Sequence, residues 1–270
     1  MGSNKNLNTN WRKVASTIYQ KPVDSKIYGS VEIDVTELEK FIAGKRKEDA
    51  KTTLNQLFTL IIGRGFKQEV PELNAYWRRG KIVPRKQIDA LVSVLLPDGQ
   101  MGSVKIENTD QLTVKELSVL MKEKIGESRR GNENKTMQSK NMLSSLPWPF
   151  RSWLFWLYKT VTIHWGFNMP VLGLSVNSFG SYVISNIGSL GLDSGYGALI
   201  PSANVSIVMI LGRVTKKPVV VNDEIVSRRI LSLSATLDHR VVDGSHGGKL
   251  FRFIKQMVKN PHLLEHPPEK

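Results

Sequence analysis

The chain has 270 residues, 40% of them hydrophobic and 23% charged, which is ordinary for a globular protein long enough to bury a core of its own. It has no cysteine, which excludes disulfides, cysteine nucleophiles and thiolate metal sites, and its five histidines form no H-E-x-x-H pair. The net charge of +14 favours an anionic partner, but no recognition motif accompanies the scattered basic residues, so we expect neither a metal nor a nucleic acid as ligand.

Hydrophobic residues in the first half recur at period two or at helical spacing. Thr36 and Thr113 stand where helix N-caps are expected, and Gly44 is the kind of residue that ends a helix. The predicted elements are a strand (27–35), two helices (36–44 and 53–66), three short strands (82–83, 88–96 and 104–106) and a helix (113–125).

The second half reads as strands followed by one helix. Residues 128–140 are polar and resemble a disordered segment. Strands are predicted at 181–185, 205–214, 218–221 and 230–237, and a helix runs from Gly244 to about Asn260, where Pro261 stops it. We therefore expect one α/β domain spanning residues 1–270, with a mixed sheet covered by helices.

His239 stands at the junction between the last predicted strand and the last helix. A side chain there projects from a rigid scaffold, and an unperturbed pKa of about 6.5 suits proton transfer near neutrality. A histidine alone is more often structural than catalytic, so the residues around it decide its interpretation.

Four segments, in chain order, carry a family resemblance: 11–15 (WRKVA), 71–75 (PELNA), 181–191 (SYVISNIGSLG) and 238–244 (DHRVVDG). The last resembles the H-x-x-x-D-G signature shared by chloramphenicol acetyltransferases and the catalytic domains of 2-oxoacid dehydrogenase acyltransferases, and its D-H-R form is similar to the latter. The resemblance implies a chloramphenicol-acetyltransferase-like two-layer sandwich, a mixed β-sheet covered by helices, assembled as a trimer.

The resemblance also implies roles for individual residues. His239 would deprotonate the thiol of CoA, or of dihydrolipoamide in the reverse direction, and the Ser185 hydroxyl would stabilise the tetrahedral oxyanion. Asp243 has the spacing of a triad member, but the resemblance pairs it with Arg12 so that it holds the turn, and Gly244 would permit a close backbone there. The active site would lie between subunits, with histidine from one chain and serine from its neighbour.

The expected function is therefore CoA-dependent acyl transfer to a thiol acceptor such as dihydrolipoamide. The sequence carries neither a lipoyl nor a subunit-binding domain, so we expect a trimmed chain, a lipoyl-bearing partner acting in trans, or another acceptor. The alternative is a catalytically inactive homologue that serves as a structural core or membrane-associated scaffold. With no secretory signal, the expected location is the cytoplasm, or the mitochondrial matrix in a eukaryote.

A tryptophan-rich insert at about 132–175 departs from the family pattern. Four of the six tryptophans (148, 153, 156 and 165) fall in it, and Arg151 and Lys159 make it a poor transmembrane span. On a helical wheel Arg151, Ser152, Lys159 and Thr162 share one arc. Two interpretations stay open: a helix buried against the sheet or another subunit, or contact of residues 147–165 with an anionic membrane surface.

Overall fold

The computed structural model describes residues 25–48, 52–97, 99, 101–130, 147, 149–167, 177–200 and 203–266. The segment 11–15, with Arg12, lies outside the described residues, as do residues 131–140 of the polar stretch. The remaining three residues of that stretch, 128–130, close a helix.

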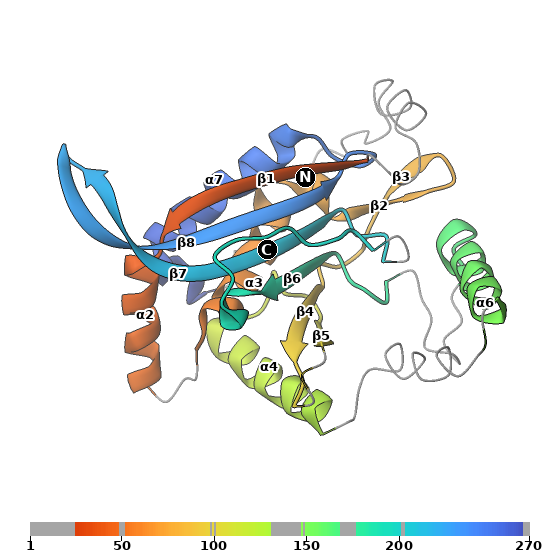
Figure 1. Cartoon of the computed structure of the whole chain (residues 1–270), viewed down its shortest axis with the longest axis horizontal. Coiled ribbons are helices and arrows are strands. Elements are labelled where there is room, and N and C mark those ends of the chain that lie inside the picture. Colours follow the sequence, from red (N-terminus) through yellow and green to blue (C-terminus); the bar gives the residue numbers. More distant parts are fainter. Residues whose placement is uncertain are drawn as a thin grey trace.

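A six-stranded sheet in the order β1-β8-β7-β6-β4-β5 forms the centre of the molecule (Figure 1). Strands β4, β6 and β7 run parallel to one another, and the other neighbours are antiparallel. The strands are β1 (Lys26–Asp34), β4 (Ala90–Leu95), β5 (Met101–Ile106), β6 (Tyr182–Asn186), β7 (Ile207–Val221) and β8 (Glu224–Asp238). The predicted mixed sheet is confirmed.

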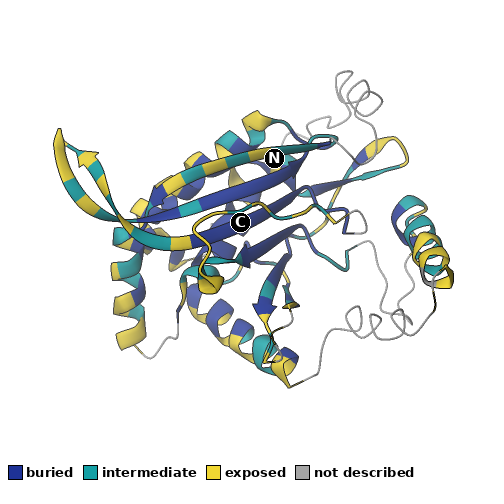
Figure 2. Cartoon of the chain, in the orientation of Figure 1, coloured by how far each residue is buried: buried dark blue, intermediate teal, exposed yellow. Residues whose placement is uncertain are grey.

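Helices cover one face of this sheet. Alternate strand residues such as Tyr182, Ile184 and Leu233 belong to the main apolar core on that face. The central strands of the sheet are largely buried (Figure 2). The opposite face has a smaller apolar cluster, including Val183, Ile210 and Leu199, and none of the described helices contributes to that cluster. The covering helices are α2 (Thr36–Lys47), α3 (Leu54–Gln68), α4 (Val114–Arg129) and α7 (Gly244–Lys259). The expected two-layer arrangement of sheet and helices is therefore confirmed.

The helix boundaries follow local capping chemistry. Thr53 and Thr113 each form a capping box with the residue three positions later, as the threonines and their spacing favour. The predicted cap at Thr36 is wrong, since Thr36 already lies in α2 and donates from its amide and hydroxyl to the Asp34 carboxylate. The predicted end at Gly44 is also wrong. Glycine costs a helix interior only about 1 kcal/mol, and α2 continues to Lys47.

Strands β7 and β8 form a long hairpin whose outer half projects from the body (Figure 1). The two predicted strands 205–214 and 218–221 are one strand, because Pro218 lies within it opposite Ser227 without breaking the pairing. Asn222 and Asp223 make the turn with φ of 51° and 65°, the positive values that a type I′ hairpin turn has at both central residues. A shorter hairpin joins β2 (Ala75–Arg78) and β3 (Lys81–Pro84).

The described part of the predicted insert is helical and stands beside the sheet (Figure 1). It consists of α6 (Phe150–Tyr158) and a π-helical turn, η2 (Lys159–His164). One face of α6 is exposed, with Phe150, Trp153 and Trp156 at 64%, 59% and 58%. Thr162 is fully buried and Ser152 is exposed, so the residues of the predicted arc do not share one environment.

Short 3-10 turns complete the described elements: η1 (Pro71–Leu73), η4 (Gly188–Leu190) and η5 (Pro261–Leu264). Within the described ranges, every helix is too short or too polar to cross a bilayer.

Candidate active site

The turn between β8 and α7 is built around Asp238. Its backbone carbonyl accepts from the amides of Val241 and Val242, and its carboxylate accepts from the amide and the guanidinium of Arg240 at 2.7–3.2 Å. The amide of His239 donates to the carbonyl of Ser25 at 2.6 Å, which ties the turn to the start of β1. These bonds fix the backbone from which the His239 side chain projects.

The His239 imidazole is oriented through Nδ1. This atom lies 3.0 Å from the Val242 carbonyl oxygen and 3.3 Å from Oδ1 of Asp243. Because a carbonyl oxygen only accepts hydrogen bonds, Nδ1 must carry the proton, and in the neutral ring Nε2 then keeps its lone pair. The arrangement therefore presents a base at Nε2.

Asp243 and Gly244 begin helix α7. The Asp243 amide donates to Nδ1 of His246 at 3.0 Å, so His246 satisfies an amide at the helix start. Gly244 is the first helical residue, and a Cβ there would meet nothing within 4 Å, so no steric need for glycine is evident. Arg12, the expected partner of Asp243, lies outside the described residues.

Ser185 lies near the end of β6 on the sheet face without helices. Strand alternation places it with Val183 rather than with the core residues Tyr182 and Ile184. It is buried, and within the described part of the chain its hydroxyl has no hydrogen-bond partner. The hydroxyl is therefore available to a ligand.

Ser185 and His239 do not meet within one chain. Ser185 pairs with Ile210 of β7, which pairs with Ser234 of β8, five residues before His239. The two Cα atoms are two inter-strand spacings apart across the sheet and five residues apart along the strand direction. Together these distances separate the two Cα atoms by roughly 19 Å. That exceeds hydrogen-bond reach for the two side chains.

Glycines shape the turn that follows Ser185. A Cβ on Gly188 would lie 2.5 Å from the carbonyl oxygen of Gly212 in β7, and Gly191 has φ of 87°. Both positions therefore require glycine, one for close backbone approach and one for its left-handed conformation. The PELNA segment, which carries part of the family resemblance, forms η1 and the start of β2, and the side-chain amide of Asn74 donates to the Arg85 carbonyl.

The model of the family described as 2-oxoacid dehydrogenases acyltransferase (catalytic domain) matches residues 6–142 and 176–265. The chain belongs to this family. Residues 143–175, which include α6 and η2, lie outside both matched stretches of the acyltransferase domain.

The dihydrolipoyllysine-residue acetyltransferase component of the pyruvate dehydrogenase complex of Rickettsia bellii is 26% identical to the chain over 264 residues. The aligned part is 95% of this chain and 53% of that protein, so the chain spans about half the length of the curated relatives that it matches along its whole length.

Solved structures show the same acyltransferase fold. The probable dihydrolipoamide acetyltransferase from Listeria monocytogenes superposes with a TM-score of 0.66 at 19% identity, covering 92% of this chain and 88% of that one. A chloramphenicol acetyltransferase superposes with a TM-score of 0.51 at 11% identity, covering 96% of this chain and all of that one. The chloramphenicol-acetyltransferase-like fold is therefore confirmed.

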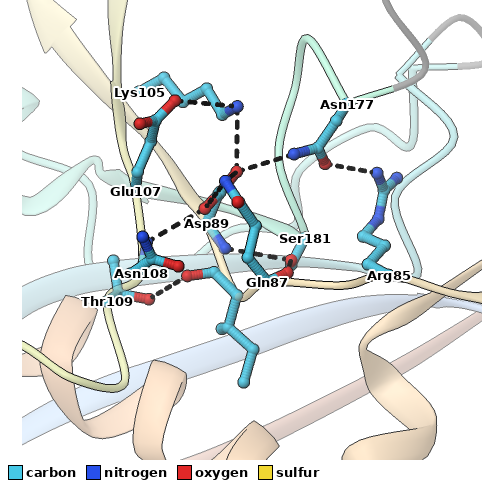
Figure 3. Close-up of polar contacts among 10 residues, drawn as sticks. Arg85, Gln87, Asp89, Lys105, Glu107, Asn108, Thr109, Asn177 and Ser181 are labelled. Carbon is cyan, nitrogen blue, oxygen red and sulfur yellow. Dashed lines mark hydrogen bonds and ion pairs between the residues drawn. The ribbon is translucent and has the colours of Figure 1, made fainter.

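A buried polar network that sequence reasoning missed supports β6 in this acyltransferase domain (Figure 3). The fully buried carboxylate of Asp89 accepts from Gln87, from Lys105 at 2.9 Å, and from the side-chain amide of Asn177 at 2.8 Å. The amide of Asp89 in turn donates to the hydroxyl of Ser181. The network joins the start of β4, the end of β5 and the approach to β6, and so fixes the strand that carries Ser185.

The charge state of Asp89 follows from its partners. Burial alone would raise the pKa of this carboxyl, but hydrogen bonds from Gln87, Lys105 and the Asn108 amide together hold its pKa below the usual value. The one signal in the sequence is that Asp89 is a charged residue inside the predicted strand 88–96. Nothing in the sequence indicates that Asn177 and Lys105 contact it. Among the described residues, no cluster of three His, Asp or Glu side chains could hold a metal ion.

Proposed function

We propose that the chain is a CoA-dependent acyltransferase that moves an acyl group between CoA and dihydrolipoamide, with His239 as general base. The observation that carries the proposal is the bond between Nδ1 of His239 and the Val242 carbonyl, because it leaves Nε2 as the proton acceptor. Family membership supports the same chemistry.

In the proposed step Nε2 of His239 takes the thiol proton, and the thiolate attacks the carbonyl carbon of the acyl thioester. The tetrahedral intermediate collapses by breaking the original carbon–sulfur bond. The departing thiolate recovers the proton from the imidazolium, so the base is regenerated. With a thiol pKa near 8.5, taking cysteine as the model, a positioned base of ordinary strength is enough.

Ser185 is proposed to donate its hydroxyl to the oxyanion of that intermediate. The buried hydroxyl without a partner in the described residues supports this role. The separation of roughly 19 Å from His239, estimated from strand geometry, supports a site completed by the serine of a neighbouring subunit. We accordingly propose a trimer or an assembly of trimers.

Asp243 is proposed to assist in two ways. Its carboxylate, 3.3 Å from Nδ1 of His239, favours the Nδ1–H form of the ring and stabilises the imidazolium that forms. Pairing with Arg12 would hold the turn in shape, with Gly244 beside it. Arg12 would thus support the site without touching the substrate.

The acceptor is proposed to be a lipoyl group supplied in trans, and the location the cytoplasm. The Rickettsia bellii relative is a component of a bacterial pyruvate dehydrogenase complex, which supports this acceptor and this location. A catalytically inactive scaffold is less well supported, because His239 keeps the geometry of a base.

The test is a thiol-release assay with acetyl-CoA and dihydrolipoamide. We expect His239→Ala to lower kcat by about 10²–10⁴, the usual contribution of a general base, while His262→Ala, an exposed histidine in η5, leaves it unchanged. Equal turnover by wild type and His239→Ala, or none by the wild type with any acyl-CoA and thiol pair, would favour the scaffold.

A second candidate property, contact with an anionic membrane surface, is supported by the exposed aromatic face of α6. Phe150, Trp153 and Trp156 are aromatic side chains of the kind that settle at bilayer interfaces. The β2–β3 hairpin beside it adds the exposed cations Arg79 and Lys81, and Arg79 donates to the η2 carbonyl of His164.

Flotation with vesicles tests this contact. We expect the chain to float with vesicles that contain phosphatidylserine and to remain below with phosphatidylcholine alone, and the double variant Trp153→Ser, Trp156→Ser to lose flotation. The exposed Val119→Ser on α4 serves as the control. Absence of wild-type flotation with anionic vesicles would contradict the proposal.

A further inference from the structure

A pocket of about 150 Å³ lies where the insert meets the catalytic turn. The start of β1, the end of β8, the β2 strand and the π-helical η2 all contribute to its wall. Residues in that wall that bear on its chemistry are Lys26, Trp77, Lys159, Ile163, Asp238 and Arg240. Two of these, Lys159 and Ile163, belong to the segment outside the family match.

The pocket carries an excess of positive charge. Among the described residues that line it, Asp238 is the only one with a carboxylate, and both of its oxygens accept from the Arg240 guanidinium. Lys26 lies directly opposite Asp238 in the β1–β8 register but makes no ion pair with it. Within the described part of the chain, neither Lys26 nor Lys159 has a carboxylate partner. Two lysines that have no carboxylate partner among the described residues therefore line one cavity.

The size of the pocket limits what it can take. Sites for whole organic ligands measure roughly 300–1,000 Å³, so this pocket suits one functional group of a larger molecule or a small ion. Its wall includes Trp77, Ile163 and Leu199, which reduce access of water and strengthen the pull of the ammonium groups on an anion. Two positive charges match a group that carries a charge of about −2, which is the charge of a phosphate monoester near neutrality.

We propose that this pocket binds a phosphate group, with Lys26 and Lys159 as its cationic contacts. Lysine binds phosphate as a point charge with three donors, and the Arg240–Asp238 pair remains intact beside it. The insert is then part of a binding site, since Lys159 brings the second charge. Two sources share this chemistry: a phosphate of CoA, the substrate under the proposed function, or the headgroup of an anionic phospholipid.

Calorimetric titration of the full chain with inorganic phosphate tests the pocket. We expect Lys26→Gln and Lys159→Gln each to weaken binding about tenfold or more, and the double variant to abolish it. Lys122→Gln, which removes the same charge from an exposed position on α4, should bind as the wild type does. Equal melting temperatures of all variants would show that the fold is retained.

Two further probes distinguish the sources. CoA is compared with dephospho-CoA, which lacks the 3′-phosphate, and vesicles containing phosphatidic acid are compared with phosphatidylcholine alone. A loss of affinity in the double variant for CoA but not for dephospho-CoA identifies the CoA phosphate, and a loss for the acidic vesicles identifies the headgroup. The proposal is overturned if the double variant matches the wild type with inorganic phosphate, CoA and vesicles alike.

The binding measurement does not depend on the proposed acyl transfer. Titrations contain no acyl donor and are repeated with His239→Ala, which leaves the pocket wall unchanged because His239 does not line it. A chain that binds phosphate but transfers no acyl group would refute the proposed function and leave the pocket standing. A chain that transfers acyl groups but does not bind phosphate in the pocket would refute the pocket proposal and leave the proposed function standing.

Discussion

At the level of single side chains, two hydrogen-bonded groups show how surroundings select a tautomer in one case and a charged form in the other. The Val242 carbonyl places the His239 proton on Nδ1, and the donors around Asp89 keep a fully buried carboxylate charged. The histidine was predictable because its motif is contiguous in the sequence. The Asp89 network was not, since its partners Lys105 and Asn177 come from segments 16 and 88 residues away.

Asp89→Asn should lower the free energy of unfolding by about 3 kcal/mol at pH 7, because it removes one partner of a buried ion pair. The wild-type contribution is present above the unfolded-state pKa of about 3.9, and it is lost as the pH falls through the lower folded-state pKa. Urea unfolding at pH 7 and pH 3 should therefore show that the difference in the free energy of unfolding between wild type and variant is smaller at pH 3.

A matched control for that experiment is Asp223→Asn in the β7–β8 turn. Its side chain is exposed, and asparagine tolerates the same positive φ, so we expect little change in stability at either pH. A gap for Asp89→Asn that is equally large at both pH values would contradict the assignment of the charged form.

At the level of helices and strands, close backbone contacts decide at which positions a particular residue type is required. Periodicity predicted most helices and strands, but the predicted ends of α2 and β7 were wrong. Gly44 and Pro218 are residue types that often end a helix or a strand, but here each lies inside its element. The turn after β6 behaves in the opposite way. Gly188 is required there by the backbone of Gly212, which lies 24 residues away in the chain.

Gly188→Ala should lower both stability and activity. The added methyl would lie 2.5 Å from the Gly212 carbonyl oxygen, and relieving that contact must shift the end of β6 that carries Ser185, at a cost of about 1–3 kcal/mol. Gly126→Ala is the matched control, since its methyl meets nothing in α4 and should stabilise the helix by about 0.5–1 kcal/mol. Thermal unfolding and the thiol-release assay would measure both, and wild-type values for Gly188→Ala would refute the steric argument.

On the scale of the whole molecule, the separation of Ser185 from His239 predicts complementation between inactive chains. Mixed trimers refolded from equal amounts of His239→Ala and Ser185→Ala should recover about one quarter of wild-type activity, because one interface in four then combines two intact residues. Each variant refolded alone should stay inactive. If the mixture recovers nothing while still forming trimers, the two residues do not share a site between subunits.

The overall fold was predictable from sequence because four short motifs fall in the family order, and the sheet with its covering helices follows from them. The placement of the insert was not. The pattern of its aromatic residues is compatible with a buried helix and with a helix at a membrane interface. Only the structure shows that Trp153 and Trp156 are exposed in the chain.

The position of β1 in the sheet affects how the chain can fold as it is made. β1 pairs only with β8 in the described sheet, Lys26 opposite Asp238, although the two residues stand 212 positions apart. During synthesis at about 5–20 residues per second, β1 therefore spends roughly ten seconds or more on the ribosome before its partner exists. Until then its edge is unpaired, and loop closure over such a separation makes this pairing a late and slow step. Nascent chains of this protein should accordingly depend on chaperones until the last strand has emerged.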